Sequence, residues 1–104
     1  MSHPAAAPVT DNPTKSRFEM PVEGETAFVA YQRRGPKVLY LYHAEVPFRL
    51  NGKGYGGQLV EGTLQAIRAA GTDKVIAGCS FVRRYMAEHP EHDDLRAPPA
   101  TAMG

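Results

Sequence analysis

The middle of the chain changes its hydrophobic period once, and this change limits the folds that the sequence can adopt. Residues 37–46 alternate with a period of two, as in a β-strand, and Pro47 ends the run because it has no backbone N–H to donate. From Tyr55 to Ala70 the apolar residues recur at helical spacing, and Gly71 is suited to end a helix. Between the two lies the glycine-rich stretch 51–57. The pattern therefore predicts a strand, a glycine-rich loop and a helix in direct succession.

The strand expected at residues 37–46 begins with apolar residues on both of its faces. With regular alternation, its two faces are Val38/Tyr40/Tyr42/Ala44/Val46 and Leu39/Leu41/His43/Glu45. Apolar residues on both faces predict a central strand that is covered on both sides, with the tyrosines in the core. The second face ends in two ionisable groups.

The other elements complete a small mixed fold. Strands are expected at residues 17–22 and 27–32, and with residues 37–46 they form an antiparallel meander. A fourth strand is expected at 75–79, reached by a right-handed crossover if it runs parallel to its neighbour, and a second helix at 81–89. The order β-β-β-α-β-α predicts a compact α+β fold, an antiparallel meander followed by α-β-α, with the helices packed on a central mixed sheet.

Length and composition exclude several classes of protein. The chain has 104 residues, and its proline-rich ends predict disordered tails at residues 1–16 and 96–104 around one domain at residues 17–95. Twelve basic and 11 acidic residues give a net charge of +1, which provides no electrostatic footprint for nucleic acid. The sequence has no apolar run long enough to cross a bilayer, so a membrane partner is not expected. It also shows no secretory signal pattern. The single cysteine excludes an intramolecular disulfide and suits a reducing cytoplasm.

The glycine-rich stretch is suited to hold an anionic phosphate group. Its glycines let backbone N–H groups turn toward one point, and the helix that follows adds free N–H donors and the positive end of its dipole. A flexible loop without a ligand is the alternative. Three known glycine patterns do not fit: the dinucleotide fingerprint lacks its acidic residue after the next strand, the KH loop lies between two helices, and a Walker loop requires G-K-[ST].

The stretch from Asn51 to Gly56 resembles the acyl-CoA pyrophosphate loop of the GNAT acetyltransferase superfamily, Q/R-x-x-G-x-G/A. Gly54 and Gly56 stand at its two small positions, and Asn51 stands where the family has Gln or Arg. Three further motifs agree with the same family: His43-Ala44-Glu45-Val46-Pro47, Cys79-Ser80-Phe81-Val82 and His89-Pro90-Glu91. Over about residues 17–95 the chain is similar to the short, single-domain branch of this superfamily, the YjdJ-like predicted N-acetyltransferases.

The resemblance implies a half-size GNAT fold that binds acetyl-CoA as acyl donor. In the family the donor lies where the central strand and the strand after the helix diverge, and its pantetheine arm pairs with the central strand, here at Glu45 and Val46. Its pyrophosphate would rest on the glycine-rich loop, namely Gly52, Lys53, Gly54, Tyr55, Gly56 and Gly57, with Lys53 adding a charge. Larger members carry extra N-terminal elements that build the acceptor site. We therefore expect an acceptor site that is shallow or shared with a partner, which makes a homodimer an option.

Acetyl transfer to an amine requires a base for the amine and a proton for the leaving thiolate. Members of this branch carry a cysteine at the position of Cys79, and a helix N-terminus, such as the one expected at Phe81, favours its reactive thiolate form. The alternative is a small buried hydrophobe. His43 or Glu45 could act as the base, or the pair could only position the donor. Tyr85 could protonate the thiolate, although a tyrosine on a helix face is more often part of the core.

The same residues allow two other interpretations, a metal site and a binding module without catalysis. A zinc site at His89, His92, Asp93 and Cys79 is disfavoured because structural zinc sites use two or more cysteines, so we expect no metal. The function predicted is acetyl-CoA-dependent transfer to an unidentified amine, by direct attack or through Cys79. The competing hypothesis is a non-catalytic acyl-CoA-binding module, which the shortness of the acceptor side favours.

Overall fold

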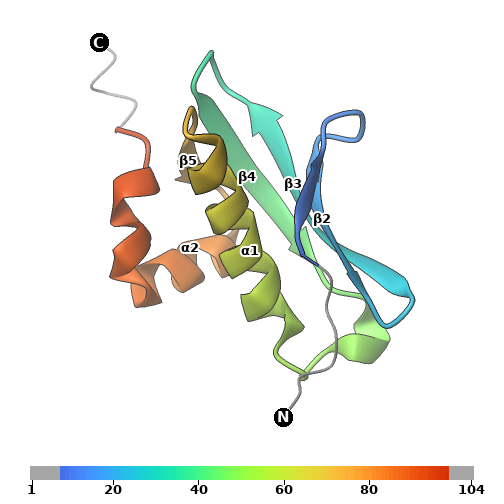
Figure 1. Ribbon diagram of the computed structural model, residues 1–104. Coiled ribbons are helices and arrows are strands. Elements are labelled where there is room, and N and C mark those ends of the chain that lie inside the picture. The colour runs from blue at the N-terminus through green and yellow to red at the C-terminus, as the bar shows by residue number, and fades with distance from the viewer. Residues whose placement is uncertain (1–7, 99–104) are drawn as a thin grey trace.

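The computed structural model describes residues 8–98 as one five-stranded sheet with helices packed on it (Figure 1). The strands are β1 (Thr10–Asn12), β2 (Arg17–Val22), β3 (Glu25–Arg33), β4 (Val38–Glu45) and β5 (Lys74–Ala77), and they lie side by side in this order. The helices are α1 (Tyr55–Ala70) and α2 (Ser80–Glu88), with short 3-10 helices η1 (Phe48–Leu50) and η2 (Pro90–Leu95). Strands β1 to β4 pair antiparallel and β4 pairs parallel with β5. The predicted α+β fold with a mixed sheet is confirmed.

Helix α1 provides most of the cover for the sheet. It lies across one face in Figure 1, and it contacts β1, β2, β3 and β4, whereas α2 contacts β4, β5 and η2. Both helices share one core cluster with the sheet: Met20, Val29, Leu41, Leu59, Leu64, Val82 and Met86 are among its buried members. A fully buried side chain of this size contributes about 1.5–3 kcal/mol to folding. Among the described residues, no helix has the length and hydropathy needed to cross a bilayer.

The sheet extends further toward the N-terminus than the sequence predicted. Residues 10–12, which were expected in a disordered tail, form the edge strand β1 and pair with residues 17–19 of β2. The three residues of β1 are polar and show no hydrophobic alternation, so the sequence pattern does not indicate a strand there. The Tyr31 hydroxyl donates to Asp11 at 2.8 Å and helps to hold β1 on the sheet. The C-terminal tail predicted at 96–104 is also ordered at its start, since Arg96 forms a bridge with Val75 and the Ala97 N–H donates to the Val75 carbonyl at 2.8 Å. The parts of the predicted tails at 1–7 and 99–104 lie outside the described residues.

Strand β4 contains a bulge that changes which residues share a face. Leu41 pairs with Tyr31 of β3 and His43 pairs with the preceding residue, Ala30, so Tyr42 is an extra residue in the ladder. After the bulge, Ala44 and Val46 pack toward the core, whereas His43 points away from it. The prediction that Leu39, Leu41, His43 and Glu45 share one face was therefore wrong beyond residue 41.

The second face of the sheet is open, which corrects the prediction that β4 is covered on both sides. The open face carries Tyr40, Tyr42, His43, Glu45 and Ile76, and Tyr42 and Ile76 are 48% and 36% exposed. Both helices pack on the other face, which carries the buried residues. The tyrosines stack on each other at 6.2 Å on this open surface instead of lying in the core.

Candidate functional site

The glycine-rich loop leaves the start of α1 without a side-chain cap. Gly54 is the N-cap residue and has a left-handed backbone with φ of 84°, which glycine adopts without strain, and Gly52 has the same φ. Because no side chain caps the helix, the N–H groups of its first turn remain available to a ligand, together with the positive end of the helix dipole. The first helical residue, Tyr55, is 1% exposed and anchors this turn in the core. The loop thus presents free donors on a fixed support.

Strands β4 and β5 separate next to this loop. Their ladder ends at the pair Leu41 and Ala77, and the N–H groups of Gly78 and Cys79 both donate to the Leu41 carbonyl, at 2.9 and 3.1 Å. From there the chain turns into α2, whereas β4 continues to Glu45 paired only with β3. The edge of β4 that faces β5 is therefore free of a strand partner over its last residues. The bulge at Tyr42 bends the strand at the same point.

A pocket of about 370 Å³ joins the loop to this free edge. It is lined by Ala44, Val46, Leu50, Asn51, Gly52, Gly54, Tyr55, Gly56, Gly57, Leu59 and Phe81. We call it the loop pocket. Six of the residues predicted to bind the donor are in its wall, namely Val46, Gly52, Gly54, Tyr55, Gly56 and Gly57; Glu45 and Lys53 are not. Ala44 and Phe81 also line the pocket, and neither was predicted as a site residue, although both lie in the motifs of the family resemblance.

The turn between β2 and β3 holds the loop from outside. Glu23, in this turn, accepts a hydrogen bond of 2.6 Å from the Tyr55 hydroxyl and lies 3.5 Å from Lys53 Nζ. Its backbone carbonyl accepts a bond of 2.7 Å from Arg49. The hydrogen bond from Tyr55 lowers the pKa of Glu23, with Lys53 and Arg49 contributing, and it raises the pKa of Tyr55. The charge of Lys53 is thus already partnered.

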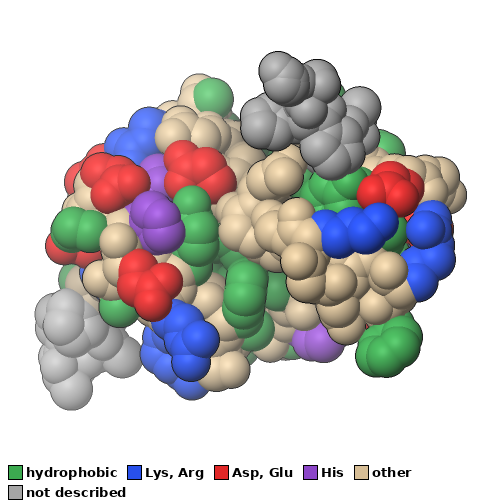
Figure 2. Space-filling view, turned by 90° about the horizontal axis from the view of Figure 1, so that it is seen from below, with side chains coloured by type: hydrophobic (Ala, Val, Ile, Leu, Met, Phe, Trp, Pro, Cys, Tyr) green, Lys and Arg blue, Asp and Glu red, His purple; other side chains and the backbone are tan. Residues whose placement is uncertain are grey.

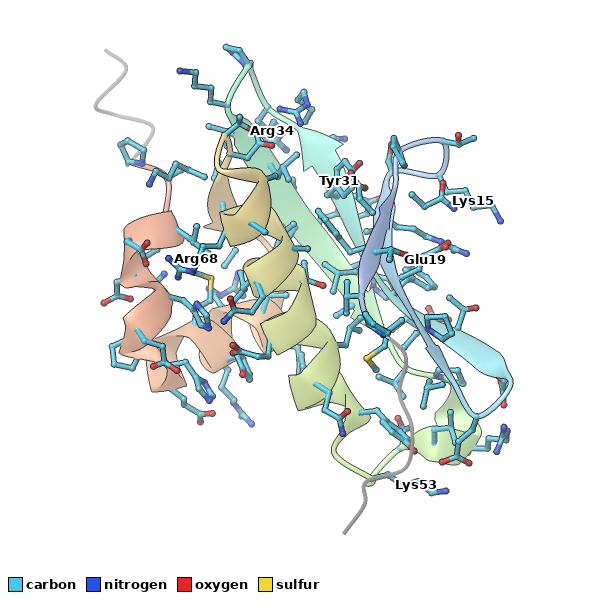
Figure 3. All side chains as sticks on the ribbon, viewed as in Figure 1. Lys15, Glu19, Tyr31, Arg34, Lys53 and Arg68 are labelled. Carbon is cyan, nitrogen blue, oxygen red and sulfur yellow. The ribbon has the colours of Figure 1, made fainter. Side chains whose placement is uncertain are left out.

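The end of the molecule at which α1 begins is not a basic patch. Figure 2 views this end and shows Lys and Arg side chains next to Asp and Glu side chains, and Figure 3 shows Lys53 beside the start of α1. Arg49 and Lys53 are balanced by Glu23 and Glu25. An anion at this end would therefore depend mainly on backbone donors.

The three predicted catalytic residues lie around the opening between β4 and β5, outside the wall of the loop pocket. Cys79 directly precedes α2 and is partly exposed. His43 and Glu45 are on the open face of the sheet, where His43 Nε2 lies 3.0 Å from Glu45 Oε1. The backbone of Glu45 belongs to the free edge of β4, but its side chain points away from the pocket. The structure therefore brings His43 and Glu45 together and puts Cys79 at the end of the neighbouring strand.

Tyr85 belongs to a polar network between α1, α2 and η2. Its hydroxyl donates to Glu61 at 2.7 Å, and burial together with this bond raises the pKa of Tyr85. Burial opposes the ionisation of Glu61, but hydrogen bonds from Gln65, Tyr85 and His92 outweigh it and lower the pKa of Glu61 to about 2. The Tyr85 hydroxyl therefore already donates its proton in a hydrogen bond to the Glu61 carboxylate. This makes Tyr85 a poor proton donor for a thiolate in this arrangement.

His92 is the buried centre of the same network, with 1% of its surface exposed. Arg68, labelled in Figure 3 between α1 and η2, lies 3.1 Å from His92 Nδ1, and it can only donate. The proton of the ring is therefore on Nε2, which donates to Glu61 at 2.8 Å. Glu61, Glu91 and His92 offer ligand atoms within 4.8 Å of one another, but these hydrogen bonds already account for Glu61 and His92. The cluster is explained as a structural network.

Two comparisons bear on this geometry. A comparison with curated protein sequences yields no match. Residues 17–95 match the sequence model of a family described as GCN5-related N-acetyl-transferase.

Proposed function

Because the chain belongs to the GCN5-related N-acetyltransferase family, we propose that it transfers an acetyl group from acetyl-CoA to an amine. The observation that carries the proposal is the loop pocket, in which the uncapped N-terminus of α1 and the free edge of β4 line one space. The first is suited to a pyrophosphate and the second to an extended chain with amide groups. A CoA thioester contains both, in its pyrophosphate and its pantetheine arm.

The residues of the pocket fit such a donor. The pyrophosphate would accept hydrogen bonds from the backbone of Gly52 to Gly57, with Lys53 near enough to add its charge. The amides of the pantetheine arm would pair with the backbone at Glu45 and Val46, as a peptide adds to the edge of a sheet. This arrangement directs the thioester toward the point where β4 and β5 separate, next to Cys79.

Two routes for the transfer follow from the residues around the opening. In direct transfer, the amine nitrogen attacks the thioester carbonyl carbon, and the proton of the amine passes to His43 or Glu45. The C–S bond then breaks, and CoA leaves as a thiolate that takes up a proton. In the other route, the thiolate of Cys79 attacks first, and CoA leaves as a thiol after taking up a proton. The amine then attacks acetyl-Cys79 and loses a proton, the C–S bond to Cys79 breaks, and the thiolate of Cys79 is restored. His43 and Glu45 are on the open face, so the amine would approach from the side opposite the donor.

The competing proposal is a non-catalytic acyl-CoA-binding module. It is favoured by one observation: none of Cys79, His43 and Glu45 is in the wall of the loop pocket. Mass spectrometry of the protein mixed with acetyl-CoA separates the two proposals, because it detects the bound donor and any acetylated residue together. Calorimetry with CoA gives the affinity.

Variants then separate the two routes. Transfer through Cys79 predicts that Cys79→Ser abolishes the acetyl-enzyme, whereas direct transfer predicts that Cys79→Ser retains much of its turnover. Under direct transfer, His43→Ala or Glu45→Ala should lose about 10²-fold or more, as removal of a general base does. Full activity in all three variants would leave the chain as a binding module.

Location and assembly complete the proposal. The single cysteine supports a reducing compartment, the cytoplasm. An acceptor site completed by a second copy of the chain is supported by the open face of the sheet, and light scattering of the purified protein tests it.

A further inference from the structure

The ring of Tyr40 covers the backbone at the point where β4 and β5 separate. A Cβ atom added to Gly78, the residue after β5, would overlap Tyr40 Cε1 and lie 2.6 Å from Cζ. Gly78 is not among the glycines with a positive φ, so its backbone conformation does not require glycine. The packing does require it, because the Tyr40 ring occupies the place of the missing side chain.

This contact lies at the last hydrogen bonds between β4 and the chain that leaves β5. The N–H groups of Gly78 and Cys79 donate to the Leu41 carbonyl at 2.9 and 3.1 Å, and beyond Leu41 the edge of β4 has no partner in β5. An aromatic ring on a glycine of the neighbouring strand replaces the contacts that glycine lacks. The Tyr40 ring therefore stabilises the end of the ladder, where the opening of the sheet begins.

The Tyr40 ring is itself held in place on the open face. The guanidinium of Arg34, labelled in Figure 3, lies 4.0 Å from the centroid of the ring, and its Nε donates to the Gln32 side chain at 2.9 Å. Tyr42 stacks on the ring from the same strand, with 6.2 Å between the centroids. Contacts with a cation and with a second ring favour the position of Tyr40 on Gly78.

We propose that Tyr40 is a positioning residue, whose ring on Gly78 fixes where the sheet opens and thereby holds Cys79 beside the thioester end of the donor. This inference rests on the proposed function, because it concerns the donor arm that enters the same opening. Cys79 is the N-cap residue of α2 and is bonded to β4 only through its own N–H and that of Gly78, so fraying of the ladder end displaces it. A displacement of about 1 Å between reacting groups can lower a rate by about 10²-fold.

The test measures how far bound CoA protects Cys79 from iodoacetamide, with the alkylation followed by mass spectrometry. Cys79 is the only cysteine of the chain, so the signal has one source. Each variant is saturated with CoA according to its own affinity, measured by calorimetry, so that a change in affinity does not affect the result. In the wild type, CoA should slow alkylation by about tenfold or more, because its thiol end covers Cys79. In Tyr40→Ala the protection should fall to about twofold or less, because Cys79 no longer lies beside the bound arm.

Three further variants test the contact itself. Tyr40→Phe keeps the ring and should retain the protection of the wild type. Gly78→Ala displaces the ring and should lower the protection as Tyr40→Ala does, and the double variant should lower it no further, because both changes remove the same contact. Tyr42→Ala, at a tyrosine of the same face that is 48% exposed, is the matched control and should retain the protection. Urea unfolding checks that the variants are folded.

The outcomes separate this inference from the proposed function. If the wild type binds no CoA, the proposed function fails, and the inference fails with it. If the wild type binds CoA without protection of Cys79, or if Tyr40→Ala retains the protection, the role of Tyr40 is overturned while the donor site stands. The same conclusion follows if Tyr40→Phe or Tyr42→Ala loses as much protection as Tyr40→Ala.

Discussion

The first turn of α1 and the part of α1 that faces η2 use their polar groups in opposite ways. At the N-terminal end, Gly54 provides no cap and the first N–H groups are left to a ligand. Further along the helix, Glu61 and Arg68 are hydrogen-bonded in the network around His92. Unused donors beside a pocket indicate binding, because leaving them free lowers stability unless a ligand or water satisfies them. Polar side chains whose hydrogen-bonding groups are satisfied by one another indicate a structural role.

The largest expected effect is on the hydrogen-bond network around His92. His92→Ala should lower the free energy of unfolding by about 3 kcal/mol, since it leaves a cavity and removes hydrogen bonds from Glu61 and Arg68. Urea unfolding measures this change, and calorimetry should show an affinity for CoA close to that of the wild type. The control is His89→Ala, which removes a partly exposed ring and should destabilise less. A loss below about 1 kcal/mol for His92→Ala would contradict the structural role of the network.

The next largest effect is expected on CoA affinity, and it separates the two glycines that flank α1. Gly54 and Gly71 both have left-handed backbones, with φ of 84° and 77°, and neither has a neighbour within 4 Å of an added Cβ. Gly54→Val and Gly71→Val should therefore lose stability to a similar extent through backbone strain. Only Gly54→Val should also weaken CoA binding, by at least tenfold or about 1.4 kcal/mol, because it covers the free N–H groups. Equal loss of binding in both variants would show that strain, and not the donors, is responsible.

A smaller effect, an increase in the free energy of unfolding, is expected from a substitution in the middle of α1. The Thr63 hydroxyl is buried and has no hydrogen-bond partner among residues 8–98. Thr63→Val has nearly the same shape and removes this unpaired group, so it should raise the free energy of unfolding by about 1 kcal/mol. Thr26→Val, at an exposed position of β3, is the control for the substitution itself. Destabilisation by Thr63→Val would mean that the hydroxyl has a partner, such as a buried water.

The smallest effect concerns the cation of the loop. Lys53 has 48% of its side chain exposed and is paired with Glu23, so its charge contributes little to an anion at the loop. Lys53→Ala should weaken CoA binding by no more than about threefold, and the difference should shrink as salt is added. Calorimetry at two salt concentrations measures both. A tenfold loss would show instead that the side chain, and not the backbone, is the main phosphate contact.

Much of the fold was predictable because its signals are local. Helix α1 has the expected bounds of residues 55–70. The helical spacing of its apolar residues, the glycines of its first turn and Gly71 directly after its end are all features of the local sequence. Strand β5 and helix α2 were expected at residues 75–79 and 81–89, and they differ from the structure by one or two residues at their ends. The glycine-rich wall of the loop pocket was found for the same reason: its residues are adjacent in the sequence.

The rest depended on contacts between distant segments. The bulge at Tyr42 arises from the pairing of β4 with β3, and it decides that Ala44 faces the pocket while His43 faces the open side. Glu23 reaches Tyr55 across 32 positions, and Glu61 reaches His92 across 31. No periodicity in one segment encodes such a partner.

The sequence by itself determined the order of the elements, the uncapped glycine loop before α1 and, through its motifs, the family. These follow from backbone preferences and side-chain spacing within a few residues. Only the tertiary structure decided the register of β4, the cover of one face of the sheet, the partner of Lys53 and the seat of Tyr40 on Gly78. These depend on which surfaces meet when the chain closes on itself, because packing selects one arrangement among several that the local sequence allows.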